Sequence, residues 1–235
     1  MNLTDLIKKT YLYRVYHKRN VEKAQIELAI RNKYFLEEGT ELLQNFARNL
    51  NNNNILFWLE FGSLLGYYRE HDFIKHDCDI DFGIYLQDAD KTRKVLENAG
   101  FKLIHQFIAS DGGLEECYKY KHTSIDIFYF REDKDRLYCN SFMPRYPLLI
   151  QKLIRSHRYL VKRIDIPKQE FIKDEYKGAI INVPTDCVKH LKMHYGETFM
   201  TPNPNFNYRK EASNITYYDY SEIKGKFFSF GDKLS

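Results

Sequence analysis

Cysteine motifs, long apolar runs and a signal-like N-terminus are all missing from this sequence. Its four cysteines lie 39, 22 and 48 residues apart, at positions 78, 117, 139 and 187, with no Cys-x-x-Cys pair. Neither a zinc knuckle nor a disulfide framework is therefore expected, and we interpret the chain as a reduced, cytosolic protein. No stretch approaches the roughly 18 consecutive apolar residues of a membrane span, and the N-terminus lacks the apolar run of about 7 to 15 residues that a signal peptide needs.

A strong excess of charge is also missing from most of the chain. The formal net charge is +4, and residues 1–20 carry all of it, because their five Lys and Arg residues face one Asp. A neutral body gives no reason to expect a nucleic-acid partner. The basic N-terminal segment suggests the hypothesis of a peripheral contact with an anionic membrane at its inner face, and a plain solvated helix is the alternative.

The composition that is present is that of a globular chain with many aromatic rings. Hydrophobic residues make up 43% and charged residues 29%, and 19 Tyr and 17 Phe accompany one Trp. A length of 235 residues allows one large domain or two small ones, at roughly 100 to 200 residues per domain.

Helix-period and strand-period patterns are interleaved along the chain. Residues 3–50 have helical spacing with Gly39 as a candidate break, and Asn51–Asn54 stop the pattern. The sequence predicts an α+β (α/β) domain with a mixed sheet, N-terminal helices packed on it and a helical C-terminal part. Strands are predicted over 55–60, 78–86, 101–108, 114–121, 123–130 and 136–142, and further helices over 63–68, 88–98, 148–159 and 183–194.

The most specific chemical signal is the run Asp77-Cys-Asp79-Ile-Asp81. Alternate side chains of a strand share a face, so the three carboxylates are expected on one side while Cys78 and Ile80 face the core. Carboxylates at this spacing repel one another unless cations neutralise them, and such oxygen ligands suit Mg²⁺ or Mn²⁺. The alternative is that Asp77 caps a turn and the other two are surface strand residues.

A further carboxylate, Asp126, lies in the middle of the apolar strand predicted over 123–130. A buried carboxylate is costly without a partner, so a metal ion or an arginine is expected beside it. If this strand neighbours the acidic one, the acids converge into an arrangement for metal-assisted phosphoryl transfer. A salt-bridged sheet residue is the alternative for Asp126.

Gly62 and Ser63 stand at a predicted strand-to-helix junction, thirteen residues before the acidic run. Glycine lets the backbone approach a phosphate, and the N–H groups of a helix start favour negative charge. Arg69 on the same short helix is a candidate for binding a diphosphate, although an ion pair with Glu70 or Asp72 is an equally ordinary use.

The twenty residues from Gly62 to Asp81 resemble the signature of the LicD and fukutin-related family: Gly-Ser/Thr-Leu-Leu-Gly, an Arg, and then an acidic strand Asp-x-Asp-x-Asp. A second segment, Tyr195–Pro202, is similar to the Tyr-Gly…Pro segment near that family's C-terminus. The resemblance implies a catalytic domain over 55–204 with the nucleotidyltransferase fold shared with polymerase β. A helical segment over 1–54 and a tail over 205–235 then lie outside it.

What the resemblance implies is metal-dependent transfer of a phosphorylated alcohol, such as phosphocholine or ribitol phosphate. The donor would be CDP-linked, and the acceptor a sugar hydroxyl of a cell-surface glycan or glycolipid. Asp79, Asp81 and Asp126 would hold Mg²⁺ or Mn²⁺ and act in catalysis, and Asp77 would assist. Gly62, Ser63 and Arg69 would bind the donor.

Two features depart from this pattern or compete with it. Lys75-His76 replaces the Trp that the family usually has before its first Asp, which concerns the contact with the donor's base or head group, and the zinc-binding cysteines of the fukutin-related members are missing. His190 and His194 are four residues apart on a predicted helix, but they lack the Glu of a metalloprotease motif, so a metal role is not expected for them.

Two other classes of function are compatible with the same residues. The fold could add a nucleotide to RNA, a protein or a small molecule, or it could serve as a binding module without activity. The intact acids at 79, 81 and 126 argue against the second class.

Overall fold

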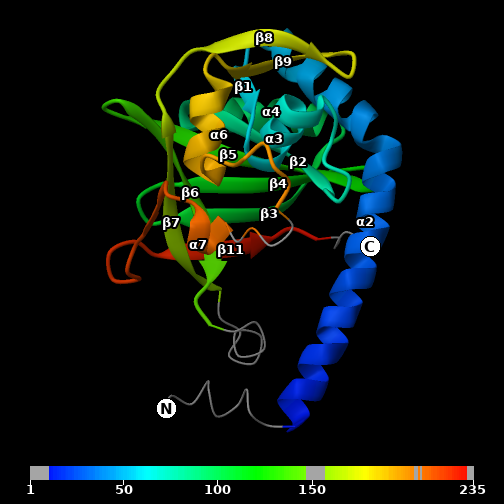
Figure 1. Ribbon diagram of the computed structural model, residues 1–235, viewed down its shortest axis with the longest axis vertical. Coiled ribbons are helices and arrows are strands. Elements are labelled where there is room, and N and C mark those ends of the chain that lie inside the picture. Colours follow the sequence, from blue (N-terminus) through cyan, green and yellow to red (C-terminus); the bar gives the residue numbers. More distant parts are fainter. Residues whose placement is uncertain (1–10, 147–156, 204–205, 207, 232–235) are drawn as a thin grey trace.

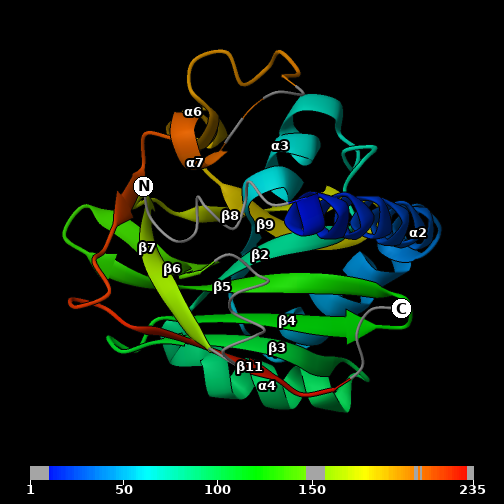
Figure 2. The ribbon, with the colours of Figure 1, turned by 90° about the horizontal axis from the view of Figure 1, so that it is seen from below.

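The structure is a computed structural model, and it describes residues 11–146, 157–203, 206 and 208–231. One large mixed sheet forms its centre, with helices on both sides and a small two-stranded sheet near one edge (Figures 1 and 2). The mixed α+β architecture predicted from the sequence is therefore confirmed. The helices are α2 (Tyr11–Asn52), α3 (Phe61–Glu70), α4 (Ala89–Asn98), α6 (Cys187–Tyr195) and α7 (Tyr208–Glu211), with a short 3-10 turn η1 (Leu86–Asp88).

The strands follow the order β1-β2-β5-β4-β3-β11-β7-β10, and β6 pairs with both β5 and β7. Because β11 pairs with both β3 and β7, the path from β5 through β4, β3, β11, β7 and β6 returns to β5 as a closed ring. The bounds are β1 (Phe57–Leu59), β2 (Asp79–Tyr85), β3 (Lys102–Ala109), β4 (Leu114–Tyr120), β5 (Thr123–Asp133), β6 (Arg136–Pro144), β7 (Arg158–Pro167), β8 (Phe171–Tyr176), β9 (Ala179–Pro184), β10 (Ile215–Tyr217) and β11 (Gly225–Ser229).

Helix α2 is one continuous helix, and its two halves have different surroundings. The C-terminal half packs on the sheet, where the Phe46 ring stacks on Phe82 with centroids 4.0 Å apart, and Leu42, Leu43 and Leu50 are fully buried. Burying one such side chain stabilises a fold by about 1.5–3 kcal/mol. The N-terminal half runs away from the rest of the molecule (Figure 1), and its Ile26 and Leu28 are exposed.

Gly39 does not break α2, contrary to the expectation from its residue type. An added Cβ would lie 3.1 Å from the Phe35 ring and 3.3 Å from the Phe73 ring. Gly39 therefore provides the space in which the loop containing Phe73 approaches the helix.

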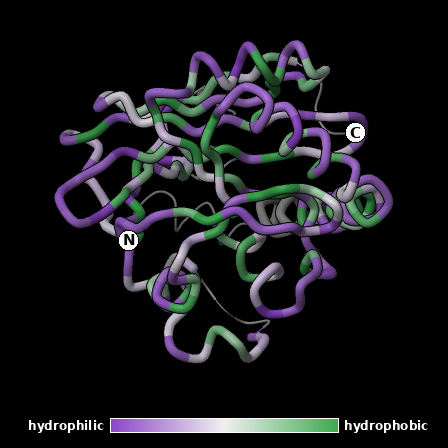
Figure 3. The backbone as a smooth tube through the Cα atoms, turned by 90° about the horizontal axis from the view of Figure 1, so that it is seen from above, coloured by the Kyte–Doolittle hydropathy of each residue, from purple (hydrophilic) through white to green (hydrophobic). Residues whose placement is uncertain are grey.

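The C-terminal part contains the helices α6 and α7, and it also contains strands that the sequence pattern did not reveal. Strands β10 and β11 pair with β7 and β3, so the expected boundary at 204/205 falls within a single sheet. Hydrophobic stretches lie mainly in the interior of the molecule, and hydrophilic residues gather at the outer turns (Figure 3).

Two predicted helices differ from the structure. Most of the helix predicted over 148–159 lies outside the described residues, but Arg158 and Tyr159 begin strand β7, because they pair with β6 and β11. The helix predicted over 183–194 begins only at Cys187, since Val183 and Pro184 belong to β9. Its N-cap is Asp186, whose carboxylate accepts the backbone N–H of Lys189 at 2.8 Å.

Candidate active site

Strands β2 and β5 run parallel and bring the predicted acids together. Asp81 lies beside Asp126, and Asp79 lies beside Ser124. Burial alternates along β2, with Ile80 and Phe82 fully buried against α2 and the two acids on the opposite face. The convergence of the acids is therefore confirmed, while their metal-binding role stays a prediction.

Asp77 reaches the same place from outside the strand. Its backbone N–H donates to the carbonyl of Ile74 at 2.9 Å, so its main chain belongs to the turn that precedes β2. Its carboxylate faces the helix start: a Cβ on Gly62 would lie 3.4 Å from Oδ2 of Asp77 and 3.9 Å from Oδ2 of Asp81. The bare backbone of Gly62 therefore leaves open space in front of two carboxylates.

The carboxyl cluster is electrostatically unfavourable as it stands. Burial, followed by the charge of Asp79, raises the pKa of Asp126 to about 7 and that of Asp77 to about 6. Burial and the neighbouring acids raise the pKa of Asp81 well above its ordinary value. The raised pKa values mean that these carboxyl groups tend to hold protons, because too little positive charge lies beside them.

These residues fit a hard divalent cation. The converging ligand atoms are carboxylate oxygens from adjacent strands, which Mg²⁺ and Mn²⁺ prefer. Asp79, Asp81 and Asp126 would hold the ion, and the open space beside Gly62 leaves room for further ligands from a substrate.

Helix α2 adds an arginine that the sequence reasoning missed. One guanidinium nitrogen of Arg31 donates to Oδ2 of Asp79 at 2.9 Å and lies 3.4 Å from the hydroxyl of Ser124. The next residue, Asn32, donates to the carbonyl of Asp77 at 2.7 Å. No local motif marks Arg31, because it stands 48 residues before Asp79.

The junction between β1 and α3 is built around Glu60, Phe61 and Ser63. The backbone N–H of Glu60 donates to the carbonyl of Asp81 at 3.1 Å, and Phe61 adopts a left-handed conformation with φ of 45°. The hydroxyl oxygen of Ser63 accepts the backbone N–H of Asp81 at 2.8 Å. Ser63 thus ties α3 to the acidic strand, and its hydroxyl hydrogen remains able to donate.

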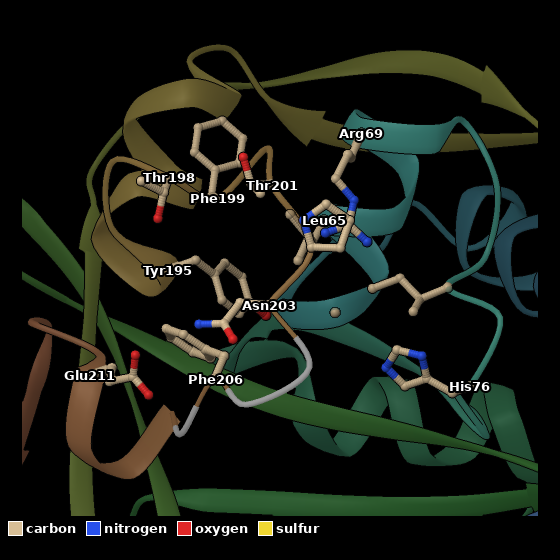
Figure 4. A pocket seen from close by; sticks show the side chains of 13 residues that line it. Leu65, Arg69, His76, Tyr195, Thr198, Phe199, Thr201, Asn203, Phe206 and Glu211 are labelled. Carbon is tan, nitrogen blue, oxygen red and sulfur yellow. The ribbon is translucent and has the colours of Figure 1, made fainter.

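Arg69 lines a cavity of about 580 Å³ between α3 and the segment that follows α6. Figure 4 shows its side chain reaching from α3 into this space, with the rings of Tyr195 and Phe206 across from it. Arg69 also pairs with Glu70 at 2.6 Å, so the ion pair considered for it is present, while its binding of a diphosphate stays a prediction. His76, from the pair that replaces the family's Trp, lines the same cavity.

A fully buried Glu–His–His cluster lies behind the junction. Oε1 of Glu60 is 2.8 Å from Nε2 of His190 and 2.9 Å from Nε2 of His194, while its Oε2 accepts the indole N–H of Trp58 at 2.7 Å. By spacing alone the cluster could hold a metal ion, because its ligand atoms lie within 4.8 Å of one another.

The outer nitrogens of the two rings favour a hydrogen-bond network instead. The amide nitrogen of Asn214 lies 3.0 Å from Nδ1 of His194, and that of Gln169 lies 3.4 Å from Nδ1 of His190. The amide of Gln169 is oriented by its oxygen, which accepts the backbone N–H of Asp186 at 2.8 Å. If both Nδ1 atoms accept, both Nε2 atoms carry the hydrogen and donate to the carboxylate.

The charge of Glu60 is stabilised by these donors. Burial alone would raise its pKa, but the two histidines together hold it well below its usual range. The network therefore joins helix α6 to the start of α3, next to the acidic strand.

Comparisons with known proteins agree with the motif. Residues 54–152 match the family described as LicD/FKTN/FKRP, nucleotidyltransferase domain. The chain is 28% identical to the human ribitol-5-phosphate transferase FKTN over 184 residues, which are 77% of this chain and 37% of that protein. It is 29% identical to an uncharacterised protein of Rickettsia prowazekii over 67% of this chain and 53% of that protein.

Among solved structures, the lincosamide antibiotic adenylyltransferase LnuA with bound lincomycin aligns at a TM-score of 0.37 and 15% identity, over 60% of this chain and 76% of that one.

The chain spans little more than a third of the length of the FKTN protein that it matches. No helix in the described part of the chain is both long and apolar enough to cross a membrane.

Proposed function

Because residues 54–152 match the LicD/FKTN/FKRP nucleotidyltransferase domain, we propose that this chain transfers a phosphorylated alcohol from a CDP-linked donor to a hydroxyl of a glycan. The human relative is named as a ribitol-5-phosphate transferase, and we propose ribitol phosphate as the first group to test. Phosphocholine is the second.

One observation carries this proposal. Three carboxylates on two parallel strands converge, and one of them, Asp81, faces Gly62 at the start of α3, which lines the same cavity as Arg69. Phosphoryl transfer needs positive charges beside the transferred group and the leaving group, because these neutralise the negative charge that both groups carry. It needs little covalent chemistry from the protein.

The roles of the residues follow from their positions. Asp79, Asp81 and Asp126 would hold Mg²⁺ or Mn²⁺, and Asp77 would complete the acidic wall beside Gly62. A bound divalent ion would neutralise charge on the donor's diphosphate. Arg69 would bind the CMP part of the donor in the larger cavity, and Ser63 would keep α3 in register with β2.

Arg31 is placed to act on the same diphosphate. Its guanidinium neutralises Asp79 in the described structure. If Asp79 held a cation, the planar fork of Arg31 would be free to bind two oxygens of a phosphate group through two parallel hydrogen bonds.

A release assay tests the proposal. The protein is incubated with Mg²⁺ and, in separate reactions, CDP-ribitol, CDP-choline, CDP-glycerol, CDP-ethanolamine, CTP and ATP. We expect CMP from one CDP-alcohol. Pyrophosphate from a triphosphate would favour nucleotidyl transfer instead, and no product from any of the six, together with no Mg²⁺-dependent thermal shift, would favour a non-catalytic module.

A further inference from the structure

A second, smaller cavity lies on the other side of Tyr195. Its volume is about 290 Å³, and Tyr195 lines both it and the larger cavity. Asp81 forms part of its wall, whereas Gly62, which faces the carboxylates of Asp77 and Asp81, lines the larger one. The acidic cluster therefore stands where the two cavities meet.

The reaction proposed above requires two binding sites on opposite sides of the transferred phosphorus. In phosphoryl transfer the attacking and leaving oxygens lie roughly in line. If the CMP part of the donor occupies the larger cavity beside Arg69, the attacking hydroxyl must approach the phosphorus from the side opposite CMP. The smaller cavity reaches the acids separately from the larger one, because Asp81 lines it and does not line the larger one.

The lining of the smaller cavity combines aromatic rings with a few polar groups. The Phe61 and Phe128 rings pack edge to face at 4.6 Å, and the Tyr208 ring lies 6.0 Å from the ammonium of Lys162. Lys162 is 6% exposed, and Ser141 is the neighbouring hydroxyl in the wall. Ring faces cover the C–H side of a polyol, while the hydroxyl and the ammonium can bind its oxygens.

A further buried carboxyl stands behind Ser141. Glu115 hydrogen-bonds to the Ser141 hydroxyl and lies near Lys162, and burial, followed by the charge of Asp126, raises its pKa to about 8. Its Oε2 is buried and has no hydrogen-bond partner among the described residues. Ser141 and Lys162 are thus held by a carboxyl group that retains unused hydrogen-bonding capacity.

We propose that this smaller cavity binds the acceptor, as one terminal sugar or alditol unit whose hydroxyl is presented to the acids at Asp81. Ser141 and Lys162 position that unit, and Phe61, Phe128 and Tyr208 cover its apolar face. The volume suits a single unit, since cavities for drug-sized ligands start at about 300 Å³. The proposal rests on the proposed transferase function.

In the transfer step the acceptor oxygen forms a bond to the phosphorus of the donor's alcohol phosphate, and the bond from that phosphorus to the bridging oxygen of CMP breaks. CMP leaves with the electron pair of the broken bond. The acceptor's hydroxyl proton is released to water, since Asp81, the acid in the cavity wall, is assigned to the cation.

The test separates donor binding from acceptor use in the full chain. Ser141→Leu fills the cavity, and Lys162→Met removes the ammonium at nearly constant shape. Ser141→Ala is the mild version that guards against misfolding. Thr198→Leu, in the wall of the larger cavity, is the matched control. Donor binding is measured by calorimetry with CDP-ribitol and Mg²⁺, and transfer by mass spectrometry with a panel of free hexoses, N-acetylhexosamines and pentitols.

We expect Ser141→Leu and Lys162→Met to bind donor within about twofold of wild type and to raise the KM for the acceptor at least tenfold. Ser141→Ala should give a smaller rise in the same direction, and Thr198→Leu should weaken donor binding instead. An unchanged acceptor KM in the cavity variants, a loss of donor binding that matches their loss of transfer, or no transfer product from any sugar or alditol with wild type would overturn the proposal. A wild-type chain that binds no CDP-alcohol would overturn the proposed function as well.

Discussion

The carboxyl of Asp126 is placed between Asp81 on one neighbouring strand and Cys117 on the other. Burial raises its pKa to about 7, against an ordinary value of 3.8. A carboxyl whose pKa is raised on folding stabilises the protein fully below its unfolded pKa, and this stabilisation is lost as the pH rises through the folded pKa.

The metal-free protein is therefore expected to lose stability between about pH 4 and pH 7, by at most about 1.4 kcal/mol per pH unit for this group. Asp126→Asn should make the stability depend less steeply on pH. Mg²⁺ should reduce the loss of stability at higher pH in wild type but not in the variant. Thermal unfolding in EDTA and in Mg²⁺ across this range measures both effects. Equal slopes in the two proteins would show that Asp126 is not the strained group.

Replacement of either central acid should separate activity from folding. Asp79→Asn and Asp81→Asn are expected to lower transfer by about 10²–10³-fold or more, because each removes one electrostatic contact to the reacting group. The metal-free melting temperature should stay equal or rise for Asp81→Asn, since a repelling charge is gone. Retained turnover in either variant would remove the assignment of the metal site.

Arg31 allows a test of the contact that sequence reasoning missed. Arg31→Gln should lower kcat/KM for the donor by about 10–100-fold, because a charge-assisted pair to phosphate is lost. Arg31→Lys should recover only part of this, since lysine lacks the planar fork. Unchanged kinetics in Arg31→Gln would confine this residue to its ion pair with Asp79.

At the scale of elements, helix α6 is joined to α3 by the hydrogen bonds of His190 and His194 to Glu60. His194→Phe should destabilise the fold by about 1–3 kcal/mol, because it leaves part of a buried carboxylate without a donor. His194→Gln, whose amide can donate, should cost less. Urea unfolding measures both, with and without EDTA; a stability that falls on chelation in wild type but not in His194→Phe would identify the cluster as a metal site.

Elements with a strong local pattern could be predicted from the sequence. The strand of Asp79 and Asp81 alternates acids with buried residues, and the strand of Asp126 is almost wholly apolar, so both were found. The sequence did not reveal that these two strands are neighbours, and only the structure shows that they pair in parallel. The partner of His194 could not be found, because Glu60 lies 134 residues away and the contact depends on how α6 packs.

Strands β7 to β11 escaped prediction for a different reason. Lys162 and Asp165 interrupt the apolar pattern of β7, yet both are buried. The Asp165 carboxylate pairs with Arg163 at 2.7 Å, and its backbone carbonyl accepts the amide of the distant Asn214 at 2.8 Å. Gly39 was predicted to break the helix, but the structure shows that it provides space for the close packing of Phe35 and Phe73.

At the scale of the molecule, the site draws on more than the matched domain. Residues 54–152 carry the acids, but Arg31 comes from α2 and Lys162 from β7. Helix α2 also supplies Leu42 and Phe46 to the core. A chain that begins at residue 55 is therefore expected to lose cooperative unfolding, which circular dichroism would show.

The basic N-terminal segment belongs to a separate prediction. A chain that begins at residue 21 keeps every described contact to the acids and should retain transfer. Its flotation with vesicles rich in anionic lipid should fall relative to the full chain, because the whole net positive charge has been removed. Equal flotation of the two chains would remove the membrane hypothesis.

In the proposed reaction the acids at 79, 81 and 126 hold a cation that activates a CDP-alcohol. The most direct measurement is CMP release from CDP-ribitol by the full chain during a Mg²⁺ titration, with Asp81→Asn in parallel. We expect release that saturates with Mg²⁺, stops in EDTA and is at least about 100-fold slower in the variant. Release that is independent of Mg²⁺, or equal in the two proteins, would contradict it.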